Sequence, residues 1–226
     1  MNKILVFDAS SVISLATNGL LDVLRELRKM YKGRFVISEV IRKELVDVPF
    51  NTKKYKLEAM QVSRLIDDGV LEVIKVNDFK NTLDFVNGIF SLKGRPMQLL
   101  HSGEIEDLLI YQQLCAEGFV VDERTMRLFL EDISEMHQLL ERKLHKRIDF
   151  DRRRAKEFQK RFTGISVLRS CELMAVAYEK GLLADNFSER FGKEEQIDAL
   201  MWGLRLRGCA VSTDEIDMFK KLVKKH

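Results

Sequence analysis

Two acidic residues of this chain stand directly after short, mainly apolar segments. Asp8 follows residues 3–7, and Asp122 follows residues 118–121. Short apolar runs between helix-like segments are typical of buried parallel strands, and ligands of open α/β sheets bind beyond the carboxyl ends of such strands. We therefore expect both carboxylates at one edge of a sheet, where a binding site would form.

Three further acids could complete such a site. Glu44 lies on the apolar helical stripe of residues 41–48, which should face the core, where an unpaired carboxylate costs on the order of several kcal/mol. Glu104 and Asp107 lie three residues apart near the start of another helical segment. Crowded carboxylates raise one another's pKa values unless a cation lies between them. Because hard divalent cations prefer oxygen ligands, the pattern predicts a Mg²⁺ or Mn²⁺ site.

Each acid also has a structural interpretation. Asp8 could cap a helix that begins directly after it, and Glu104 could stabilise a helix N-terminus by its charge. Glu44 could pair with an arginine instead of a metal ion. Glu123 competes with Asp122 for the site, although it could instead begin the next helix. The positions of the side chains in the fold must distinguish these interpretations from a shared site.

The composition is that of a globular, helix-rich protein. Of 226 residues, 46% are hydrophobic, 32% are charged and only two are proline, which excludes a disordered chain. The net charge of +3 is too small to require a polyanionic partner. Three widely spaced cysteines among apolar residues argue against a disulfide framework or a zinc site. With no signal-peptide pattern and no apolar run near the roughly 20 residues that span a bilayer, we expect a cytoplasmic protein without a membrane partner.

Strand-like and helix-like segments alternate along the chain. The expected strands are residues 3–7, 34–37, 70–76, 118–122 and 165–168, and the expected helices are about 10–17, 20–27, 38–48, 54–68, 79–90, 103–117, 124–133, 172–180, 193–207 and a last one that begins at a capping box of Ser212 and Glu215. A loop is expected at residues 94–96, and Pro49 should end its helix. The alternating series implies an α/β protein with a mostly parallel sheet and right-handed crossovers.

Four motifs, taken in order, resemble the PIN-domain nucleases. They are Asp8-Ala9-Ser10-Ser11 after an apolar strand, Glu44 in the helix after the next strand, Ser102-Gly103-Glu104 at a helix start, and the eight-residue segment 120–127 that contains Asp122. Residues 163–184 resemble the last βα unit of the same fold. The resemblance covers about residues 1–133 and 163–184.

The resemblance implies a three-layer α/β/α fold and an endoribonuclease activity that depends on Mg²⁺ or Mn²⁺. The residues that it places at the metal site are Asp8, Glu44, Glu104 and Asp122, with Asp107 as an auxiliary metal ligand and Ser10 as a polar, substrate-binding residue. RNA would be the substrate.

Two parts of the chain exceed the compact toxin members of that family. A basic insertion at about 135–162 interrupts an expected PIN-like domain of residues 1–184, and a helical extension is expected over residues 185–226. A toxin role, with an antitoxin or another inhibitory protein as partner, is therefore kept only as an alternative. The apolar positions of the last two helices would permit a homodimer.

The insertion concentrates positive charge. Between Glu135 and Phe162 there are ten Lys or Arg residues against five Asp or Glu residues, and Asp151 is placed to cap the second helix of this stretch. Charged helix faces are usually solvated, but beside a nuclease site they neutralise phosphates without reading bases. The candidate RNA contacts are Arg142, Lys143, Lys146, Arg147, Arg152, Arg153 and Arg154.

Two rival functions belong to other classes. A noncatalytic RNA-binding module would use the acids as helix caps and structural ion pairs. A phosphatase or another small-molecule enzyme of Rossmann-like architecture would also place acids at strand ends. The chain contains neither a G-x-G-x-x-G nor a Walker pattern, which argues against nucleotide binding.

Overall fold

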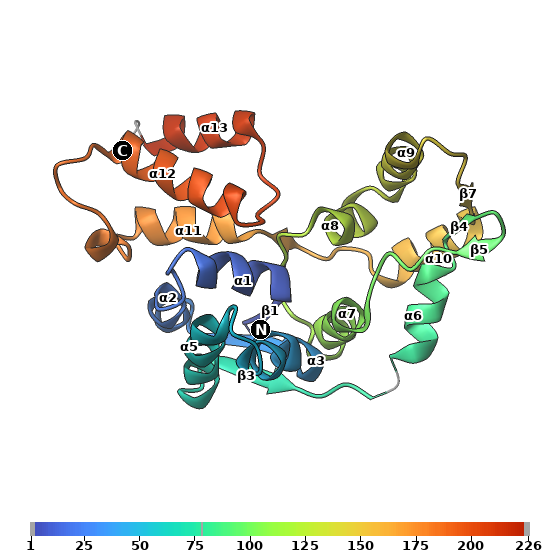
Figure 1. The fold of residues 1–226 in the computed structure, drawn as a ribbon, viewed down its shortest axis with the longest axis horizontal. Helices are drawn as coiled ribbons and strands as arrows, with labels where there is room; N and C mark the ends of the chain where they lie inside the picture. Colours follow the sequence, from blue (N-terminus) through green and yellow to red (C-terminus); the bar gives the residue numbers. More distant parts are fainter. Residues whose placement is uncertain (1–2, 78, 224–226) are drawn as a thin grey trace.

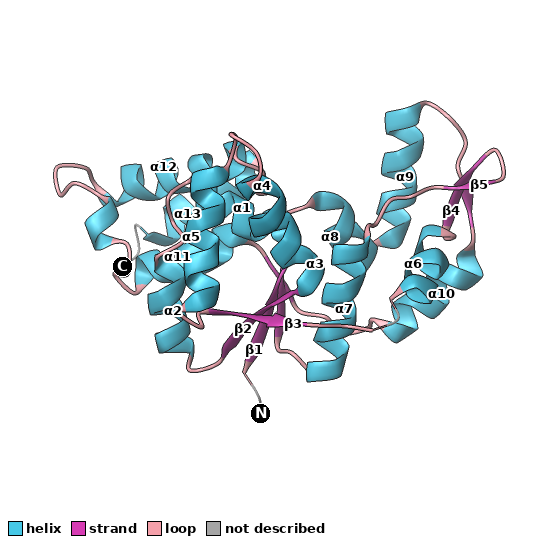
Figure 2. Cartoon of the chain, turned by 60° about the horizontal axis from the view of Figure 1, so that its bottom comes forward, coloured by secondary structure: helices cyan, strands magenta, loops and turns pink. Residues whose placement is uncertain are grey.

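A parallel five-stranded sheet forms the centre of the molecule (Figures 1 and 2). The computed structural model describes residues 3–77 and 79–223. Residues 1–2 and 78 of the expected domain 1–184 and residues 224–226 of the expected extension 185–226 lie outside the described part. The strand order is β3-β2-β1-β6-β8, and all neighbours are parallel, as predicted. The strands are β1 (Ile4–Phe7), β2 (Arg34–Ser38), β3 (Leu71–Ile74), β6 (Gly118–Val120) and β8 (Val167–Leu168).

Both faces of the sheet are buried. In β1, the side chains of Leu5 and Phe7 belong to one hydrophobic core, while those of Ile4 and Val6 belong to another. Strands covered on both faces are apolar at every position rather than at alternate ones, which explains why residues 4–7 give so clear a signal in the sequence. The sheet is therefore the middle layer of a three-layer α/β/α fold.

Helices pack against both of these cores (Figure 1). On the first core lie α1 (Ala9–Thr17), α2 (Val23–Tyr31), α5 (Lys56–Asp67), α11 (Ser170–Glu179), α12 (Lys193–Leu206) and α13 (Thr213–Val223), and on the second lie α6 (Lys80–Asn87), α7 (Ser102–Leu114), α8 (Arg124–Glu131), α9 (Ile133–Leu144) and α10 (Arg152–Arg161). Within residues 3–77 and 79–223, every helix is too short or too polar to span a bilayer.

One helical run after β2 changes its geometry twice. It consists of α3 (Glu39–Arg42), a π-helical turn η1 (Lys43–Asp47) and α4 (Val48–Phe50). The hydroxyl of Ser38 caps it by accepting a hydrogen bond of 3.2 Å from the amide of Ile41. The prediction that Pro49 ends this helix is wrong. Pro49 lies in the first turn of α4, where a missing N–H group is tolerated.

The basic insertion is anchored by a second, small sheet of order β5-β4-β7. Its strands are β4 (Phe90–Leu92), β5 (Arg95–Pro96) and β7 (Asp149–Phe150). The loop expected at 94–96 is thus part of a hairpin, whose two turn residues Lys93 and Gly94 both have positive φ, as a two-residue hairpin turn requires. The rings of Phe90 and Phe150 stack at 5.2 Å, which fastens the insertion to the segment before α7.

The C-terminal helices are tied to the carboxyl edge of the sheet. Arg169, at the start of α11, pairs with Glu215 at 2.8 Å and donates to the carbonyl oxygen of Ala210 at 3.0 Å. The amide of Ala210 in turn donates to the carbonyl oxygen of Asp122 at 3.1 Å. The predicted capping box is confirmed, because the amide of Ser212 bonds the Glu215 carboxylate at 2.7 Å and the amide of Glu215 bonds the Ser212 hydroxyl at 3.2 Å.

We predict that Glu215→Gln destabilises the protein in a pH-dependent way. Burial opposes ionisation of Glu215, but the bonds from Arg169 and Ser212 outweigh it and lower the pKa of Glu215 to about 2. Because folding lowers the pKa of Glu215, its ionised carboxylate stabilises the fold at pH values above its ordinary pKa of 4.5. This stabilisation is lost as the pH falls toward 2. Because Glu215 is partly exposed, we expect a loss of about 1–2 kcal/mol at pH 7.

Thermal unfolding from pH 7 down to pH 2.5 measures this effect. The difference in melting temperature between the wild type and Glu215→Gln should shrink as the pH falls. Glu179→Gln, which removes an exposed partner of Lys180, is the control and should change little. A difference that stays constant with pH would contradict the assigned ion pair.

Candidate active site

The carboxyl ends of β1 and β6 meet at the point where the chain changes direction in the sheet. From β1 the chain passes to β2 and β3 on one side, and later to β6 and β8 on the other side. Such switch points are where α/β sheets bind ligands. The register sets Phe7 beside Val120, and the amide of Asp8 donates to the carbonyl oxygen of Val120 at 2.9 Å. Asp8 and the pair Asp122–Glu123 therefore begin their loops side by side.

Ser10 links these two strand ends. Its hydroxyl donates to the carboxylate of Asp8 and accepts bonds from the amides of Asp122 at 3.0 Å and Glu123 at 3.2 Å. The carboxylate of Asp8 also accepts a bond of 2.8 Å from the amide of Ser10, which makes Asp8 the N-cap of α1. The expected polar residue beside the first Asp is thus present, and it positions that carboxylate. A contact of Ser10 with substrate stays a prediction.

Asp8 and Glu104 are charged groups in an environment that disfavours charge. Burial raises the pKa of Asp8 to about 6, although the hydrogen bonds from Ser10 lower it. The charges of Glu44 and Glu123 add to the rise. Burial likewise raises the pKa of Glu104 to about 8, although the amide of His101 donates to it at 2.7 Å; the charges of Asp8, Glu123 and Glu44 raise it further. These four carboxylates form one group whose members repel one another, which we call the acid cluster (Asp8, Glu44, Glu104 and Glu123).

Asp107 lies one helical turn after Glu104, on the side of α7 that faces Asp8. It is fully buried, and no hydrogen bond of good geometry reaches either carboxylate oxygen within the described residues, although the hydroxyl and amide of Ser38 lie close enough to lower its pKa. Burial raises the pKa of Asp107 well above its usual range, and the charge of Asp8 raises it further. A buried carboxyl group without a partner is costly. A cation, or a proton on Asp107 itself, would relieve this cost.

Glu44 does not face the core, contrary to the expectation from its apolar stripe. It is exposed, whereas Leu45 beside it is buried. The reason is the π-helical turn that begins at Lys43. In a π-helix each backbone hydrogen bond spans five residues instead of four, so the side chains are rotated away from the positions that 3.6-residue spacing predicts. Glu44 therefore reaches the acid cluster from the solvent side, where its carboxylate can move.

Asp122 and Glu123 have different surroundings. Asp122 is fully buried, and its carboxylate accepts bonds from both the amide and the hydroxyl of Ser170, the amide bond measuring 2.7 Å. It thereby fastens the N-terminus of α11 to β6. Glu123 caps α8 by accepting a bond of 2.8 Å from the amide of Met126, and its charge also acts on Asp8 and Glu104. The structure brings Glu123 into the acid cluster and turns the Asp122 carboxylate toward Ser170.

The donor chemistry of these residues fits a hard divalent cation. All the groups are carboxylates, their charges are uncompensated, and Asp107 offers two unpaired oxygens. As the side chains stand, no group of three or more His, Cys, Asp or Glu residues within 3–77 and 79–223 is arranged to hold an ion. Binding would therefore require side chains of the cluster to rotate, and the exposed Glu44 is free to do so.

The candidate RNA-binding residues of the insertion fall into two sets. Arg142, Lys143, Lys146, Arg147 and Arg152 are exposed and form no ion pair with any described residue. Arg142 and Lys143 lie in the last turn of α9, which starts against α8 and is about 18 Å long, and Lys146 and Arg147 follow directly after it. The helices α6, α9 and α10 and the small sheet form a smaller lobe, and Figures 1 and 2 both place this end of α9 at the outer side of that lobe. The structure therefore does not bring these four basic residues next to the acid cluster.

The other two residues make contacts within the lobe. Arg153 pairs with Glu157 at 3.1 Å. Arg154 pairs with Asp151 at 3.4 Å and reaches the carbonyl oxygen of Phe85 at 3.5 Å, which joins α10 to α6. Contacts of any of the seven residues with RNA stay predictions.

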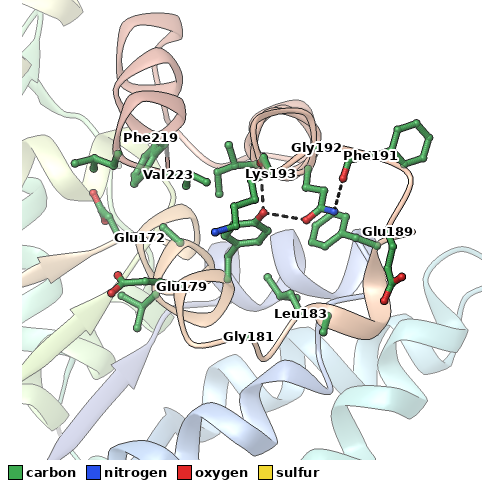
Figure 3. Close-up of a pocket in the computed structure, with 18 residues that line it drawn as sticks. Glu172, Glu179, Gly181, Leu183, Glu189, Phe191, Gly192, Lys193, Phe219 and Val223 are labelled. Carbon is green, nitrogen blue, oxygen red and sulfur yellow. Dashed lines mark hydrogen bonds between the residues drawn. The ribbon is translucent and has the colours of Figure 1, made fainter. Parts of the chain in front are cut away.

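An apolar groove of about 880 Å³ lies elsewhere, between α11, α12 and α13 (Figure 3). The hydroxyl of Tyr178 bonds the side chain of Gln196 at 2.9 Å within it, while Phe187 and Phe219 provide apolar walls. No member of the acid cluster lines this groove. Its apolar character agrees with the apolar positions noted on the last helices, where a dimer contact stays a prediction.

Comparison with known families identifies the fold. A family model described as a PIN domain matches residues 4–134. This chain belongs to the PIN-domain family. The match includes every acid of the cluster and ends where the basic insertion begins, and beyond it β8 pairs with β6 in the same sheet. No curated protein matches the chain. PIN domains are generally nucleases and typically use divalent metals, so a nuclease-type function is indicated at the level of the family.

We predict that millimolar Mg²⁺ or Mn²⁺ raises the melting temperature of this PIN-domain protein. A cation that binds only the folded state stabilises it by about 2.7 kcal/mol at 100 times its Kd. Glu104→Gln keeps an acceptor for the amide of His101 but removes one charge. Its melting temperature should respond clearly less to the cation. Glu179→Gln should respond like the wild type, and equal shifts in Glu104→Gln and the wild type would contradict the metal assignment.

Proposed function

We propose that this PIN-domain protein is a metal-dependent endoribonuclease that hydrolyses RNA phosphodiester bonds in the cytoplasm. The observation that supports it most is the acid cluster together with Asp107, since burial raises the pKa values of Asp8, Glu104 and Asp107 at a sheet switch point, and the charges of neighbouring acids raise them further. The fold by itself gains nothing from such a gathering of like charges. A site that binds cations gains affinity from it, because carboxylate oxygens attract a divalent cation.

The residues that would hold Mg²⁺ or Mn²⁺ are Asp8, Glu44, Glu104 and Asp107, with either Asp122 or Glu123 beside them. A bound cation would polarise the scissile phosphate and lower the pKa of a water molecule. Ser10 holds the Asp8 carboxylate in place and ties it to the start of α8. The exposed arginines and lysines of the insertion would hold the RNA backbone, which requires a strand long enough to reach from the lobe to the acids.

A noncatalytic RNA-binding PIN-like module is the alternative from another class, and a toxin with an antitoxin partner is the alternative within the nucleases. The caps made by Asp8, Glu104 and Glu123 are the observations that favour a structural use of the acids. Caps alone do not account for Asp107, which lies within α7 and whose pKa stays well above its usual range although Ser38 lowers it.

Asp8→Asn is the direct test. Asparagine caps helices as well as aspartate and removes a buried charge, so we expect an unchanged or higher melting temperature. Cleavage of single-stranded RNA with Mn²⁺ should fall at least about 100-fold, the scale on which loss of a group that stabilises a transition state acts. Cleavage at the wild-type rate by a folded Asp8→Asn protein would reject the proposal.

A second pair of variants assigns the role of the adjacent acids. Asp122→Asn removes the charge that binds Ser170, so we expect a loss of stability of about 1–3 kcal/mol. Glu123→Gln keeps the acceptor for Met126 and should leave the melting temperature unchanged while lowering the rate of cleavage with Mn²⁺. The reverse pattern, with Asp122→Asn stable but inactive and Glu123→Gln fully active, would return the catalytic role to Asp122 alone.

A further inference from the structure

Aromatic and lysine residues gather on the segment that connects α4 with α5, residues 48–57, which we call the aromatic–lysine segment. Phe50 is 46% exposed and Tyr55 is 47% exposed, although large rings are usually buried. Lys53, Lys54 and Lys56 lie between and beside them, and the segment contains no acidic residue. Nothing in the acid cluster explains why two rings and three cations share this surface.

The ammonium group of a lysine lies over each of the two exposed rings. Lys54 Nζ lies 4.6 Å from the ring centroid of Tyr55, and Lys56 Nζ lies 4.4 Å from that of Phe50. Among the described residues, none of the three lysines pairs with a carboxylate within 4.0 Å. The surface therefore presents flat apolar rings and uncompensated positive charge at the same places.

The segment continues directly from the acid cluster. Glu44 and Phe50 belong to one helical run and are six positions apart, which corresponds to roughly 9 Å along a helix axis. The following helix α5 packs against both η1, which carries Glu44, and α1, which Asp8 caps. A chain molecule lying on the aromatic–lysine segment would thus lead toward Glu44.

We propose that the aromatic–lysine segment binds single-stranded RNA, with bases stacked on Phe50 and Tyr55 and with the phosphates between them held by Lys53, Lys54 and Lys56. This rests on the proposed function and adds a substrate class and an entry path to it. Aromatic rings stack on any base, and lysines follow the backbone, which is the usual chemistry of sequence-tolerant single-strand binding. Protein interfaces are depleted of lysine at their cores, so three unpaired lysines among the apolar side chains favour a polyanion over a protein partner.

Binding of two labelled strands tests the stacking separately from the charge. One is a single-stranded RNA, and the other has the same length and backbone but lacks bases; fluorescence anisotropy is measured in EDTA, which prevents cleavage. Phe50→Ala/Tyr55→Ala should bind the RNA at least about fivefold more weakly for each ring and bind the abasic strand like the wild type. Lys53→Ala/Lys54→Ala/Lys56→Ala should weaken both strands, and its salt dependence of log K should fall by about 2.

Phe191→Ala is the matched control. Phe191 is 45% exposed and has Arg190 at 4.5 Å from its ring centroid, but it lies in the C-terminal part, at the rim of the apolar groove. This variant should bind both strands like the wild type. Equal loss in Phe191→Ala and in the double ring variant would overturn the assignment, as would a wild type that binds neither strand.

The outcomes separate this inference from the proposed function. If the wild type cleaves RNA with Mn²⁺ and the double ring variant cleaves the same strand with an unchanged KM, the inference fails and the nuclease stands. If the wild type never cleaves but the ring variant loses affinity only for the strand with bases, the binding site stands and the nuclease fails. If the ring variant changes only the oligomeric state in light scattering, the surface joins copies of this chain and the inference is overturned.

Discussion

Repulsion between partly desolvated carboxylates is the constraint around which this structure is arranged. The parallel sheet forces the ends of β1 and β6 together, and the helical segments that follow β2 and precede β6 bring Glu44 and Glu104 to the same edge. Glu104 lies on α7, which packs against β1 and β2, so this packing holds it near Asp8. Burial then raises both of their pKa values, and the charged neighbours that act on them among the described residues are all acidic, so ionising either group is unfavourable. Such a site is stable only with protons or with an added cation.

The neighbouring acids show how the same fold treats structural carboxylates. Asp122 receives two bonds from Ser170 at the N-terminus of α11, and Glu215 receives those of Arg169 and Ser212. Both are compensated, and both join the C-terminal helices to the sheet. Asp107 is as buried as Asp122, but its pKa stays well above the usual range despite the nearby Ser38, which distinguishes it from the acids that hold the fold together.

The sequence predicts the sheet and part of the site for physical reasons. Apolar runs such as residues 4–7 and the acids that follow them are readable because a doubly buried strand tolerates no polar residue. The exposure of Glu44 could not be predicted, since a π-helical turn shifts side chains away from the regular spacing on which the reading relied. The two-residue strand β7 is too short to alternate, and the share of Glu123 in the cluster depends on the side-chain directions after β6. Sequence spacing likewise did not single out Phe50 and Tyr55, because periodicity does not show which rings stay uncovered.

The central claim is that Asp8 and Glu104 lie where ionisation is disfavoured in the metal-free protein, so that both carboxyl groups hold their protons to an unusually high pH. Carbon-13 NMR of the side-chain carboxyl groups, followed from pH 3 to pH 9 without divalent cations, measures this directly. The account predicts a pKa of about 8 for Glu104 and of about 6 for Asp8, and both values should fall when Mg²⁺ is added. Titration of both groups near their ordinary values of 4.5 and 3.8 would contradict it.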